Sequence, residues 1–308
     1  MSCVAVCTSG KSCRMSVSSN VQGHLPPGTL FVVATPIGNL EDVSIRAVRV
    51  LREVQVIACE DTRHTRLLLQ RYAIATPLVS YHEHNERART PELVRRLQAG
   101  ESVALVSDAG TPLLSDPGYT LIRQAISSEV PVVPVPGPSA ITAALSVAGL
   151  PTDRFVFLGF LPRKSAERRR VLEAVQAIPW TLVLFEAPTR VEATLKDLQV
   201  ILGERPVALM RELTKRFEEV LRGTPKEVLA HAQGRRLRGE VTVVVGGGAS
   251  PGATSVGDPQ EELKALLAAG TPPTEAVRKV AKAHGLPRRV VYDLAVRLRA
   301  EHGRQRHP

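Results

Sequence analysis

Residues 29–61 read TLFVVATPIGNLEDVSIRAVRVLREVQVIACED, and this stretch sets the plan of the fold. Its first six residues are rich in β-branched side chains and predict a buried strand, which the loop 35–39 follows. The spacing of apolar residues over 43–53 predicts a helix, and 54–59 predicts a second buried strand that ends at Glu60-Asp61. A strand, a helix and a strand in this order indicate an α/β pattern.

The alternation of strands and helices continues through two blocks of sequence. Further strands are expected at 79–81, 103–106 and 130–135 in the first block, and at 155–158, 181–185, 206–210 and 241–245 in the second. Thr62 and Ser139 are placed to cap the helices that follow them, and another helix is expected over 91–99. Three short helical segments are expected after a Gly/Ser/Pro-rich stretch, and the last two have the right length for a helix-turn-helix.

We therefore predict an α/β fold class, with two α/β domains and a small C-terminal helical segment. The expected boundaries are a disordered extension at 1–27, domains at 28–150 and 151–248, a linker at 249–258 and a helical segment at 259–308.

Net charge is the unusual feature of the composition. The 308 residues are 44% hydrophobic, which is enough for a core, and 40 Lys+Arg against 30 Asp+Glu give a net charge of +10. The surplus is local, because 163–170 carries +4, 261–308 carries +5 and the first 27 residues carry +2. This charge permits a polyanionic partner, and the basicity lies in one surface run and one terminal segment.

Several protein classes are disfavoured by what the sequence lacks. No apolar stretch approaches the roughly 20 residues that span a bilayer, and the first 27 residues lack the apolar region of a signal peptide. We therefore expect a cytoplasmic protein with no membrane partner. Four cysteines in a chain of this size do not indicate a disulfide framework. No G-x-G-x-x-G follows a strand, which argues against a dinucleotide fingerprint.

The loops after the expected strands carry the candidate ligand-binding residues, because ligands of open α/β sheets bind at the carboxyl ends of the strands. These loops are 35–39 (TPIGN), Glu60-Asp61, 107–112 (SDAGTP), 136–140 (PGPSA), Glu186-Ala187-Pro188 and Arg211-Glu212. Glycine and proline let the backbone approach a ligand closely, and carboxylates suit a cationic or hydroxyl-bearing ligand. Any single loop is better explained as a simple turn, but three such loops in one block indicate a site.

A family resemblance follows from longer segments. In order and spacing, VVATPIGNLED, EDTRHTR, SYHEHN, SDAGTPLLSDPG, VPGPSAITAAL and FLGFLPRK resemble the ribosomal RNA small subunit methyltransferase I family. The resemblance implies two α/β domains of the tetrapyrrole methylase superfamily type, with S-adenosylmethionine in the cleft between them. It also implies methylation of the ribose 2′-hydroxyl of a cytidine in the decoding region of 16S rRNA, and a homodimer.

The resemblance also implies cofactor-binding residues, matched position by position. They are Pro36, Ile37, Gly38, Asp108, Ala109, Gly110, Thr111, Leu114, Ser139, Ala140, Phe185, Glu186 and, more loosely, Leu213. Relatives that modify tetrapyrroles carry Gly-Gly-Asp-Pro in the third loop. This chain departs from that pattern with Ala109-Gly110-Thr111-Pro112, and its acid stands at Asp108 instead.

Methyl transfer to a hydroxyl also needs a group that accepts the hydroxyl proton. Glu60 and Asp61 are the candidate bases, because they end a buried strand on the ligand side and precede Arg63 and His64. The alternative is that the pair caps the following helix and holds a nearby arginine. If Asp61 is the base, Asp61→Asn should lose turnover while it retains donor binding.

The segment His82-Glu83-His84 raises the alternative of a metal site, because histidines two apart point the same way on a strand. No third ligand with suitable spacing appears, and H-E-x-x-H is absent. A polar loop is therefore favoured, and no metal is expected.

RNA contacts are expected in the two basic segments, where phosphates would be attracted. A basic run is more often a solvated helix face, but the family resemblance favours RNA. The expected RNA-binding residues are Arg63, His64, Arg163, Lys164, Arg168, Arg169, Arg170, Arg288 and Arg289. With one Trp and four Tyr, backbone and shape recognition should dominate over base stacking.

Two other functions stay open on the sequence alone. One is a porphyrinoid C-methyltransferase of the same superfamily, which would have no need of the basic terminal segment. The other is a non-catalytic RNA-binding ribosome assembly factor that kept the fold.

Overall fold

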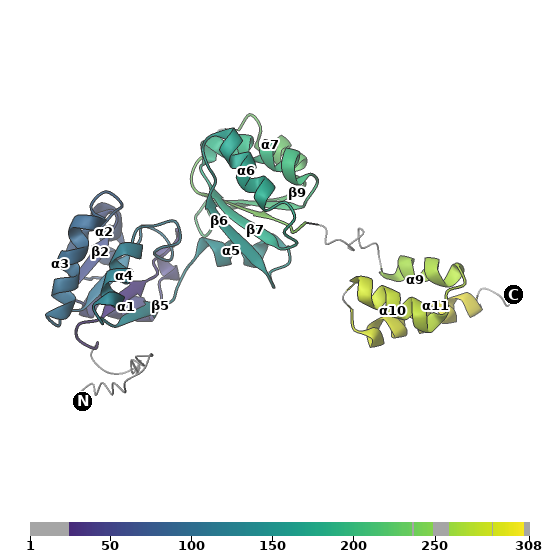
Figure 1. Ribbon diagram of the computed structural model, residues 1–308, viewed down its shortest axis with the longest axis horizontal. Helices are drawn as coiled ribbons and strands as arrows, with labels where there is room; N and C mark the ends of the chain where they lie inside the picture. Colours follow the sequence, from purple (N-terminus) through teal and green to yellow (C-terminus); the bar gives the residue numbers. More distant parts are fainter. Residues whose placement is uncertain (1–24, 236, 249–258, 285, 305–308) are drawn as a thin grey trace. The chain divides into compact units, whose positions relative to one another are not determined.

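The computed structural model describes residues 25–235, 237–248, 259–284 and 286–304 (Figure 1). Most of the expected extension and the whole expected linker therefore lie outside the described residues. The strands are β1 (Leu30–Val33), β2 (Val56–Cys59), β3 (Leu78–Ser80), β4 (Val103–Val106), β5 (Val132–Val135), β6 (Phe155–Phe160), β7 (Thr181–Glu186), β8 (Val207–Arg211), β9 (Glu219–Gly223) and β10 (Val241–Val245). The α-helices are α1 (Ile45–Glu53), α2 (Thr62–Arg71), α3 (Glu86–Gln98), α4 (Tyr119–Ser127), α5 (Ala140–Ala148), α6 (Ser165–Ala174), α7 (Val191–Leu202), α8 (Pro225–Ala232), α9 (Pro259–Ala268), α10 (Pro273–His284) and α11 (Arg288–Arg304), with 3-10 turns at Leu40–Asp42 and Pro188–Arg190. Within these residues, no helix is long and apolar enough to cross a membrane.

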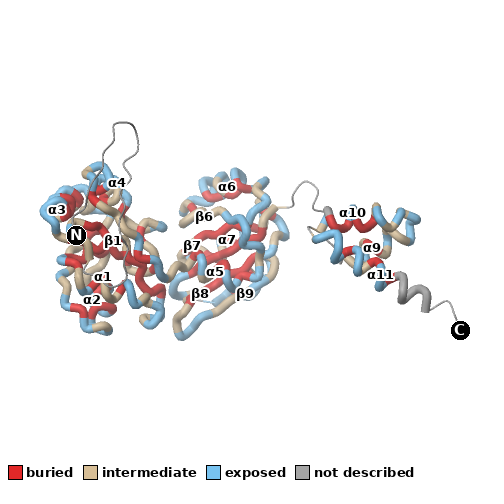
Figure 2. Tube along the Cα trace, turned by 90° about the horizontal axis from the view of Figure 1, so that it is seen from below, coloured by how far each residue is buried: buried red, intermediate tan, exposed pale blue. Residues whose placement is uncertain are grey.

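The first sheet is parallel and has the strand order β3-β2-β4-β1-β5. Buried residues gather in the part of the sheet around β1 (Figure 2). The inner strands β1, β2 and β4 are almost wholly buried, whereas the edge strands β3 and β5 are mostly half-buried. Alternate residues such as Phe31 and Val33 pack with α1 and α2, whereas Leu30 packs with α3 and α4. Because every strand is parallel, all the loops after the strands reach the same edge of the sheet.

Helix ends in the first block differ in detail from the expected ones. The residue that caps α2 is Asp61, one position before the expected Thr62, and its Oδ1 accepts from Arg63 N at 2.8 Å. Helix α3 begins at Glu86 and passes through Pro91, where the sequence predicted its start. The extra first turn is held by tertiary contacts, since Glu86 Oε1 accepts from Thr120 Oγ1 at 2.9 Å.

The second sheet is mixed, with the order β6-β7-β10-β8-β9. Strands β6 and β7 are parallel, whereas β10 is antiparallel to β7 and β8. The strand β9 was not predicted, because its sequence EVLRG is short and half polar. Helix α5 packs on this sheet, with Ile141 and Ala144 in one cluster with Val183 and Val244. The second core therefore begins before residue 150, and the expected domain boundaries stay a prediction.

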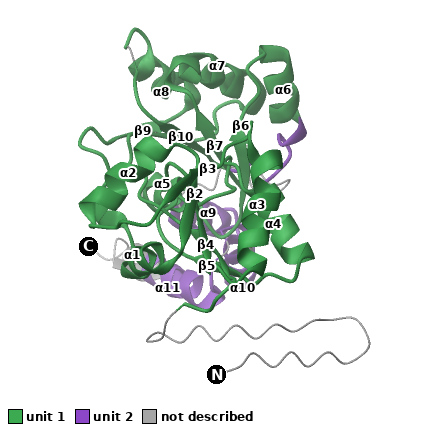
Figure 3. Ribbon diagram, turned by 90° about the vertical axis from the view of Figure 1, so that its left-hand side faces the viewer, with its two compact units in different colours: residues 1–173, 180–246 green, residues 174–179, 247–308 purple. Residues whose placement is uncertain are grey.

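The chain divides into two compact units (Figure 3). Residues 1–173 and 180–246 form the first, which holds both sheets, and residues 174–179 and 247–308 form the second. In the second unit, α9, α10 and α11 share a core of small and aliphatic side chains that includes Leu263, Val280 and Val291. The predicted α/β fold class with a terminal helical segment is confirmed.

Candidate active site

The loops after β1 and β4 are joined by backbone hydrogen bonds. Thr35 N donates to Gly110 O at 2.9 Å, and Gly110 N donates to Thr35 O at 3.0 Å. The Thr35 hydroxyl also donates to Ser107 O at 3.0 Å. Gly110 has a φ of 83°, and a Cβ at this position would lie 3.3 Å from Ile37 Cγ2. Both the backbone conformation and the closeness of the first loop therefore favour glycine here.

The loop after β5 joins the same junction. Thr111 Oγ1 donates to Pro138 O at 3.2 Å, and a Cβ on Gly137 would lie 3.1 Å from Ala34 Cβ. Ser139 is the N-cap residue of α5, as predicted, although its side chain makes no capping hydrogen bond. The three loops that the sequence singled out in the first block thus meet at one edge of the sheet.

A segment after β8 covers the first loop from the second sheet. Asn39 N donates to Thr214 Oγ1 at 3.1 Å, and a Cβ on Gly38 would lie 2.3 Å from Lys215 Cγ. The Lys215 ammonium donates to Glu212 at 3.0 Å and to Glu240 at 3.1 Å. Burial alone would lower the pKa of Lys215, but these two carboxylates raise it overall. The cation is therefore fixed beside Gly38.

This covering segment also holds an unusual backbone. Glu212 and Thr214 have φ values of 54° and 64°, which non-glycine residues seldom adopt. Leu113 and Ser115 in the β4 loop share this conformation, with φ values of 74° and 76°. Backbone strain of this kind is often found at functional sites.

Asp61 is engaged in local structure. Its carboxylate accepts from Arg63 N at 2.8 Å and from the Arg63 guanidinium at 2.8 and 3.2 Å. These bonds hold the pKa of Asp61 far below its usual range. The Asp61 N–H donates to Asp108 Oδ1 at 3.0 Å, which links the loops after β2 and β4. The cap and ion pair that the sequence left open as an alternative are therefore present.

Glu60 and Asp116 have the opposite electrostatic environment. Burial raises the pKa of Glu60, and the charge of Asp108 raises it further. Burial also raises the pKa of Asp116, to about 6, with the charge of Glu60 as the second cause. A hydrogen bond with Ser107 opposes this rise, whereas the charges of Asp108 and Glu240 add to it. Carboxylates next to strands of both sheets, those of Glu60, Asp108 and Glu240, therefore add their negative charge around Asp116.

The matched residues of the second sheet divide into two groups. Leu213 is 9% exposed and packs in one cluster with Ile37, so it lies beside the first loop as expected. Phe185 is half-buried, with ring centroids 4.9 Å from Phe157.

Glu186 corrects the expectation of a ligand contact through its carboxylate. The residue is 2% exposed. Its oxygens accept from Ala187 N at 2.8 Å and from Thr194 Oγ1 at 2.6 Å, and they pair with Arg190. The carboxylate therefore anchors the start of α7 instead of facing a ligand.

The remaining matched residues lie on the loops already described. Pro36 is buried, whereas Gly38 is exposed, and Ala109, Thr111, Ser139 and Ala140 are half-buried. Leu114 is 38% exposed at the tip of the β4 loop.

His82 lies close to this carboxylate group. The charge of His82 opposes the rise in the pKa of Glu60. The two rings of His82 and His84 are 5.9 Å apart at their centroids. His82 Nε2 lies 3.2 Å from Asn85 Nδ2, and its Nδ1 is a buried atom with no hydrogen-bond partner. Across the described residues, no three His, Cys, Asp or Glu side chains gather as metal ligands.

The basic segment at the start of α6 contains one clear correction. Arg168 is 4% exposed, and its Nε donates to Asp197 Oδ2 at 2.7 Å. Arg169 Nε donates to Asp197 Oδ1 at 2.7 Å, although half of its side chain remains exposed. Arg168 is therefore a buried anchor for α6 and not an RNA contact. The sequence could not show this, because Asp197 lies on α7.

The other predicted RNA-binding residues lie at the surface. Arg163, Lys164, Arg170, His64, Arg288 and Arg289 are exposed. Lys164 pairs with Glu167 at 3.3 Å, and the exposed Arg63 pairs with Asp61.

Two residues of this site were missed from the sequence. Asp116 stands in the SDPG segment, which contributed to the family resemblance but not to the candidate bases. Lys215 contacts Gly38 across 177 positions of sequence. The partial burial of Asp116, beside Ser115 with its positive φ, and the contact of Lys215 with Gly38 both arise only on folding. The pattern of residue types along the chain therefore could not identify either residue.

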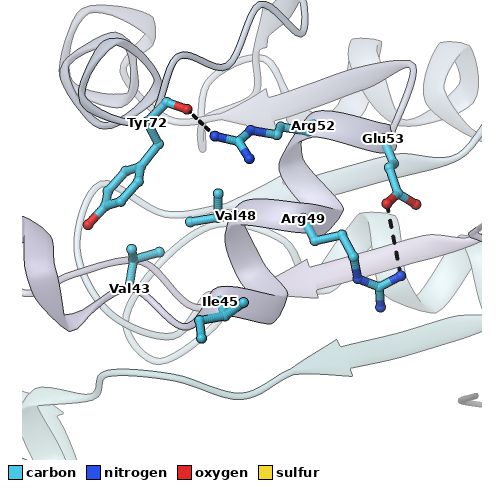
Figure 4. A pocket seen from close by; sticks show the side chains of 7 residues that line it. All are labelled: Val43, Ile45, Val48, Arg49, Arg52, Glu53 and Tyr72. Atoms are coloured by element: carbon cyan, nitrogen blue, oxygen red, sulfur yellow. Dashed lines mark hydrogen bonds and ion pairs between the residues drawn. The ribbon is translucent and has the colours of Figure 1, made fainter. Parts of the chain in front are cut away.

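A cavity of about 590 Å³ lies beside α1 (Figure 4). Its lining residues are Val43, Ile45, Val48, Arg49, Arg52, Glu53 and Tyr72. Arg52 donates to Tyr72 O at 2.6 Å, and Arg49 pairs with Glu53 at 3.9 Å. The lining shares no residue with the loops described above.

Two protein families match this chain. The family described as Tetrapyrrole (Corrin/Porphyrin) Methylases matches residues 29–229, and the RsmI C-terminal HTH domain matches residues 255–299. Over 274 residues, the chain is 50% identical to Ribosomal RNA small subunit methyltransferase I of Pseudomonas aeruginosa. This match covers 87% of this chain and 97% of that relative. It is 44% identical over 285 residues to the protein of the same name from Halalkalibacterium halodurans, with 91% and 99% covered.

A solved structure shows the same fold. Uroporphyrin-III C-methyl transferase from Thermus thermophilus, complexed with S-adenyl homocysteine, matches with a TM-score of 0.51 and 21% identity. The match covers 71% of this chain and 97% of that chain.

Proposed function

The chain belongs to the ribosomal RNA small subunit methyltransferase I family, and from this premise we propose that it methylates the ribose 2′-hydroxyl of a cytidine in the decoding region of 16S rRNA. The donor is S-adenosylmethionine. The observation that carries the proposal is the junction of three loops at the carboxyl edge of the first sheet, beside a group of partly buried carboxylates.

The residues at this junction fit the donor. Because Gly110 has no side chain and lies close to Ile37, a ligand at this edge of the sheet would meet the backbone of the loop. The negative field of Glu60, Asp108 and Asp116 favours a cation there. When bound, S-adenosylmethionine supplies a methyl group on a positively charged sulfur. The loops around Gly38, Gly110 and Ser139 would hold and orient it, and such positioning lowers the barrier.

The proton of the ribose hydroxyl needs an acceptor, and the carboxylates differ in their suitability. Asp61 is a poor acceptor, because Arg63 and the start of α2 stabilise its ionised form. Glu60 remains a candidate base, and Asp116 joins it. An acceptor whose pKa lies near the working pH combines adequate basicity with the ionised state.

RNA would approach the exposed basic residues. Arg163, Lys164 and Arg170 present charge at the start of α6, and Arg288 and Arg289 at the start of α11. Arg169 contributes the exposed part of its side chain, since one of its nitrogens binds Asp197. These cations attract phosphate without reading sequence.

The test is transfer of a labelled methyl group. The protein is incubated with labelled S-adenosylmethionine and with unmethylated small subunits, naked 16S rRNA or uroporphyrinogen. We expect label on a ribose 2′-oxygen of a cytidine in the rRNA, in the subunit sample or the naked one.

The other outcomes separate the alternative functions. Label on the tetrapyrrole alone would identify a porphyrinoid C-methyltransferase. Binding of donor and RNA without transfer would identify an assembly factor.

We also propose that the protein works as a homodimer in the cytoplasm, where small subunits are found. Sedimentation equilibrium of the purified protein tests the dimer, and a single species of monomer mass would contradict it.

A further inference from the structure

The terminal helical unit concentrates positive charge on two of its three helices. Over residues 273–298, which include α10 and the first part of α11, the sequence holds six Lys and Arg against two Asp and Glu. Helix α9 has the opposite balance, with Glu261 and Glu262 against Lys264. The positive charge of the unit therefore lies on α10 and α11, and the side chains of these two helices show where it gathers.

A cavity of about 590 Å³ lies at the corner between these two helices. Its lining residues are Arg278, Lys279, Ala281, Leu286 and Arg288. Arg278 and Lys279 share one carboxylate, that of Glu275, at 4.0 and 3.2 Å. Arg288 is exposed. Three cations against one carboxylate leave the cavity with a net positive charge.

An exposed side of α11 continues from the cavity. Residues four apart lie above one another on a helix, so Arg288, Tyr292 and Val296 form one row. Tyr292 is 57% exposed and Val296 is 51% exposed. The buried side of the helix, with Val291 and Leu298, packs in the core of the unit (Figure 2). An aromatic ring therefore lies next in line to a cationic cavity.

We propose that Arg278, Lys279, Arg288 and Tyr292 form one surface that binds an unpaired segment of ribosomal RNA. The cations of the cavity would hold backbone phosphates. The exposed ring of Tyr292 would stack on a nucleobase, which requires a base that is not paired within a duplex. The proposal rests on the proposed function for the choice of ribosomal RNA as the polyanion.

The test measures RNA affinity of the full chain by fluorescence anisotropy, at several salt concentrations. The probes are a labelled single-stranded RNA oligonucleotide and a duplex of the same sequence. Arg278→Gln/Arg288→Gln should weaken binding about tenfold near 0.1 M salt. With the single-stranded probe, it should also lower the slope of log affinity against log salt by about 1.4, roughly 0.7 for each lost phosphate contact.

A matched control removes the same charge elsewhere in the unit. Lys264→Gln/Arg297→Gln also deletes two cations, but Lys264 lies on α9, and Arg297 lies on the side of α11 opposite Arg288. The control should change affinity by less than about twofold. Thermal melting of each variant checks that the fold is kept.

Tyr292 has its own pair of variants. Tyr292→Ala should weaken single-strand binding about fivefold or more and leave duplex binding unchanged. Tyr292→Phe should retain affinity, since it keeps the ring. Equal loss with both probes would overturn the stacking contact.

Two results would overturn the surface as a whole. One is wild-type affinity in Arg278→Gln/Arg288→Gln, and the other is an equal loss in the control. Methyl transfer by the unaltered protein is measured in parallel. If the unaltered protein methylates rRNA and both double variants bind RNA normally, the surface is refuted and the proposed function stands. If Arg278→Gln/Arg288→Gln loses RNA binding but the unaltered protein transfers no methyl group, the surface is supported and the proposed function is refuted.

Discussion

At the scale of the residue, the carboxylates of the site differ because of their neighbours and not because of their own chemistry. Asp61 and Asp116 are the same side chain. Arg63 stabilises the charged form of the first. Burial and the charge of Glu60 destabilise the charged form of the second. The roles of the two acids should therefore separate in kinetics.

We expect Asp116→Asn to lower single-turnover methyl transfer by about 10²- to 10⁴-fold, the usual contribution of a general base. Donor affinity should fall far less, because Glu60 and Asp108 still favour the cationic donor. Because the pKa of Asp116 is raised to about 6, the carboxylate takes up a proton below that pH. The rate of the unaltered protein should fall as the pH drops through this value. Single-turnover rates between pH 5 and 8, with calorimetry for the donor, measure both effects.

Asp61→Asn is the matched control for this prediction. Its rate should fall much less, and its pH profile should keep the limb near 6. Glu60→Gln distinguishes the remaining candidate. If Asp116→Asn turns over at nearly the normal rate with an unchanged profile, Asp116 is not the proton acceptor.

Gly110 is the second residue whose role depends on its surroundings. We expect Gly110→Ala to destabilise the fold by about 1–3 kcal/mol, because alanine is strained at a φ of 83°. It should also weaken donor binding, since the added carbon would push on Ile37. Gly100→Ala is the control, because its φ is 91° but no atom lies within 4 Å of the added carbon. Urea unfolding and donor calorimetry compare the two, and equal donor affinity in both would refute the role of the contact.

At the scale of the element, α6 shows that one basic run serves two purposes. Arg168 points into the protein and binds Asp197 of α7, whereas Arg170 is exposed two positions later. Residues two apart on a helix point in different directions, so Arg168 can stabilise the fold while Arg170 remains available to RNA.

We expect Arg168→Ala to destabilise the protein by about 3–5 kcal/mol, because it removes a buried partner of Asp197. Arg170→Ala should change stability by less than about 0.5 kcal/mol while weakening RNA binding. Urea unfolding and RNA anisotropy measure the two effects. Equal stability of both variants would show that the buried pair contributes little.

The same ion pair predicts a dependence on acid. Burial alone would raise the pKa of Asp197, but the bonds from Arg169 and Arg168 lower it overall. The stabilisation is therefore present at neutral pH and is lost as the pH falls below the ordinary range of aspartate, through the lowered pKa. Unfolding free energies of the unaltered protein and of Arg168→Ala should converge in acid. A constant difference at every pH would contradict this.

At the scale of the whole molecule, chemistry and RNA affinity are expected to reside in different units. The junction of loops lies wholly within the first unit, and the basic corner of α10 and α11 lies in the second. A chain that ends at Gly248 should therefore keep its donor affinity within about twofold and lose rRNA affinity about tenfold or more. Calorimetry and anisotropy measure these effects, and loss of donor binding in the shortened chain would contradict the division.

Much of this architecture was present in the sequence. Apolar runs such as 103–106 predicted strands, and the positions of Gly110 and Pro138 predicted loops that approach a ligand. Such features depend on the local backbone and on burial, which residue type and spacing report directly. The family resemblance, carried by long segments, added the substrate.

The net charge of +10 was also visible from the start, as were the two segments that carry most of it. Only the tertiary structure decided which cations are available. It buried Arg168 against Asp197, used the Glu186 carboxylate inside the fold and brought Lys215 onto Gly38. The reason is physical: the environment of a charge depends on partners brought close by folding, and their distance along the chain carries no signal of that contact.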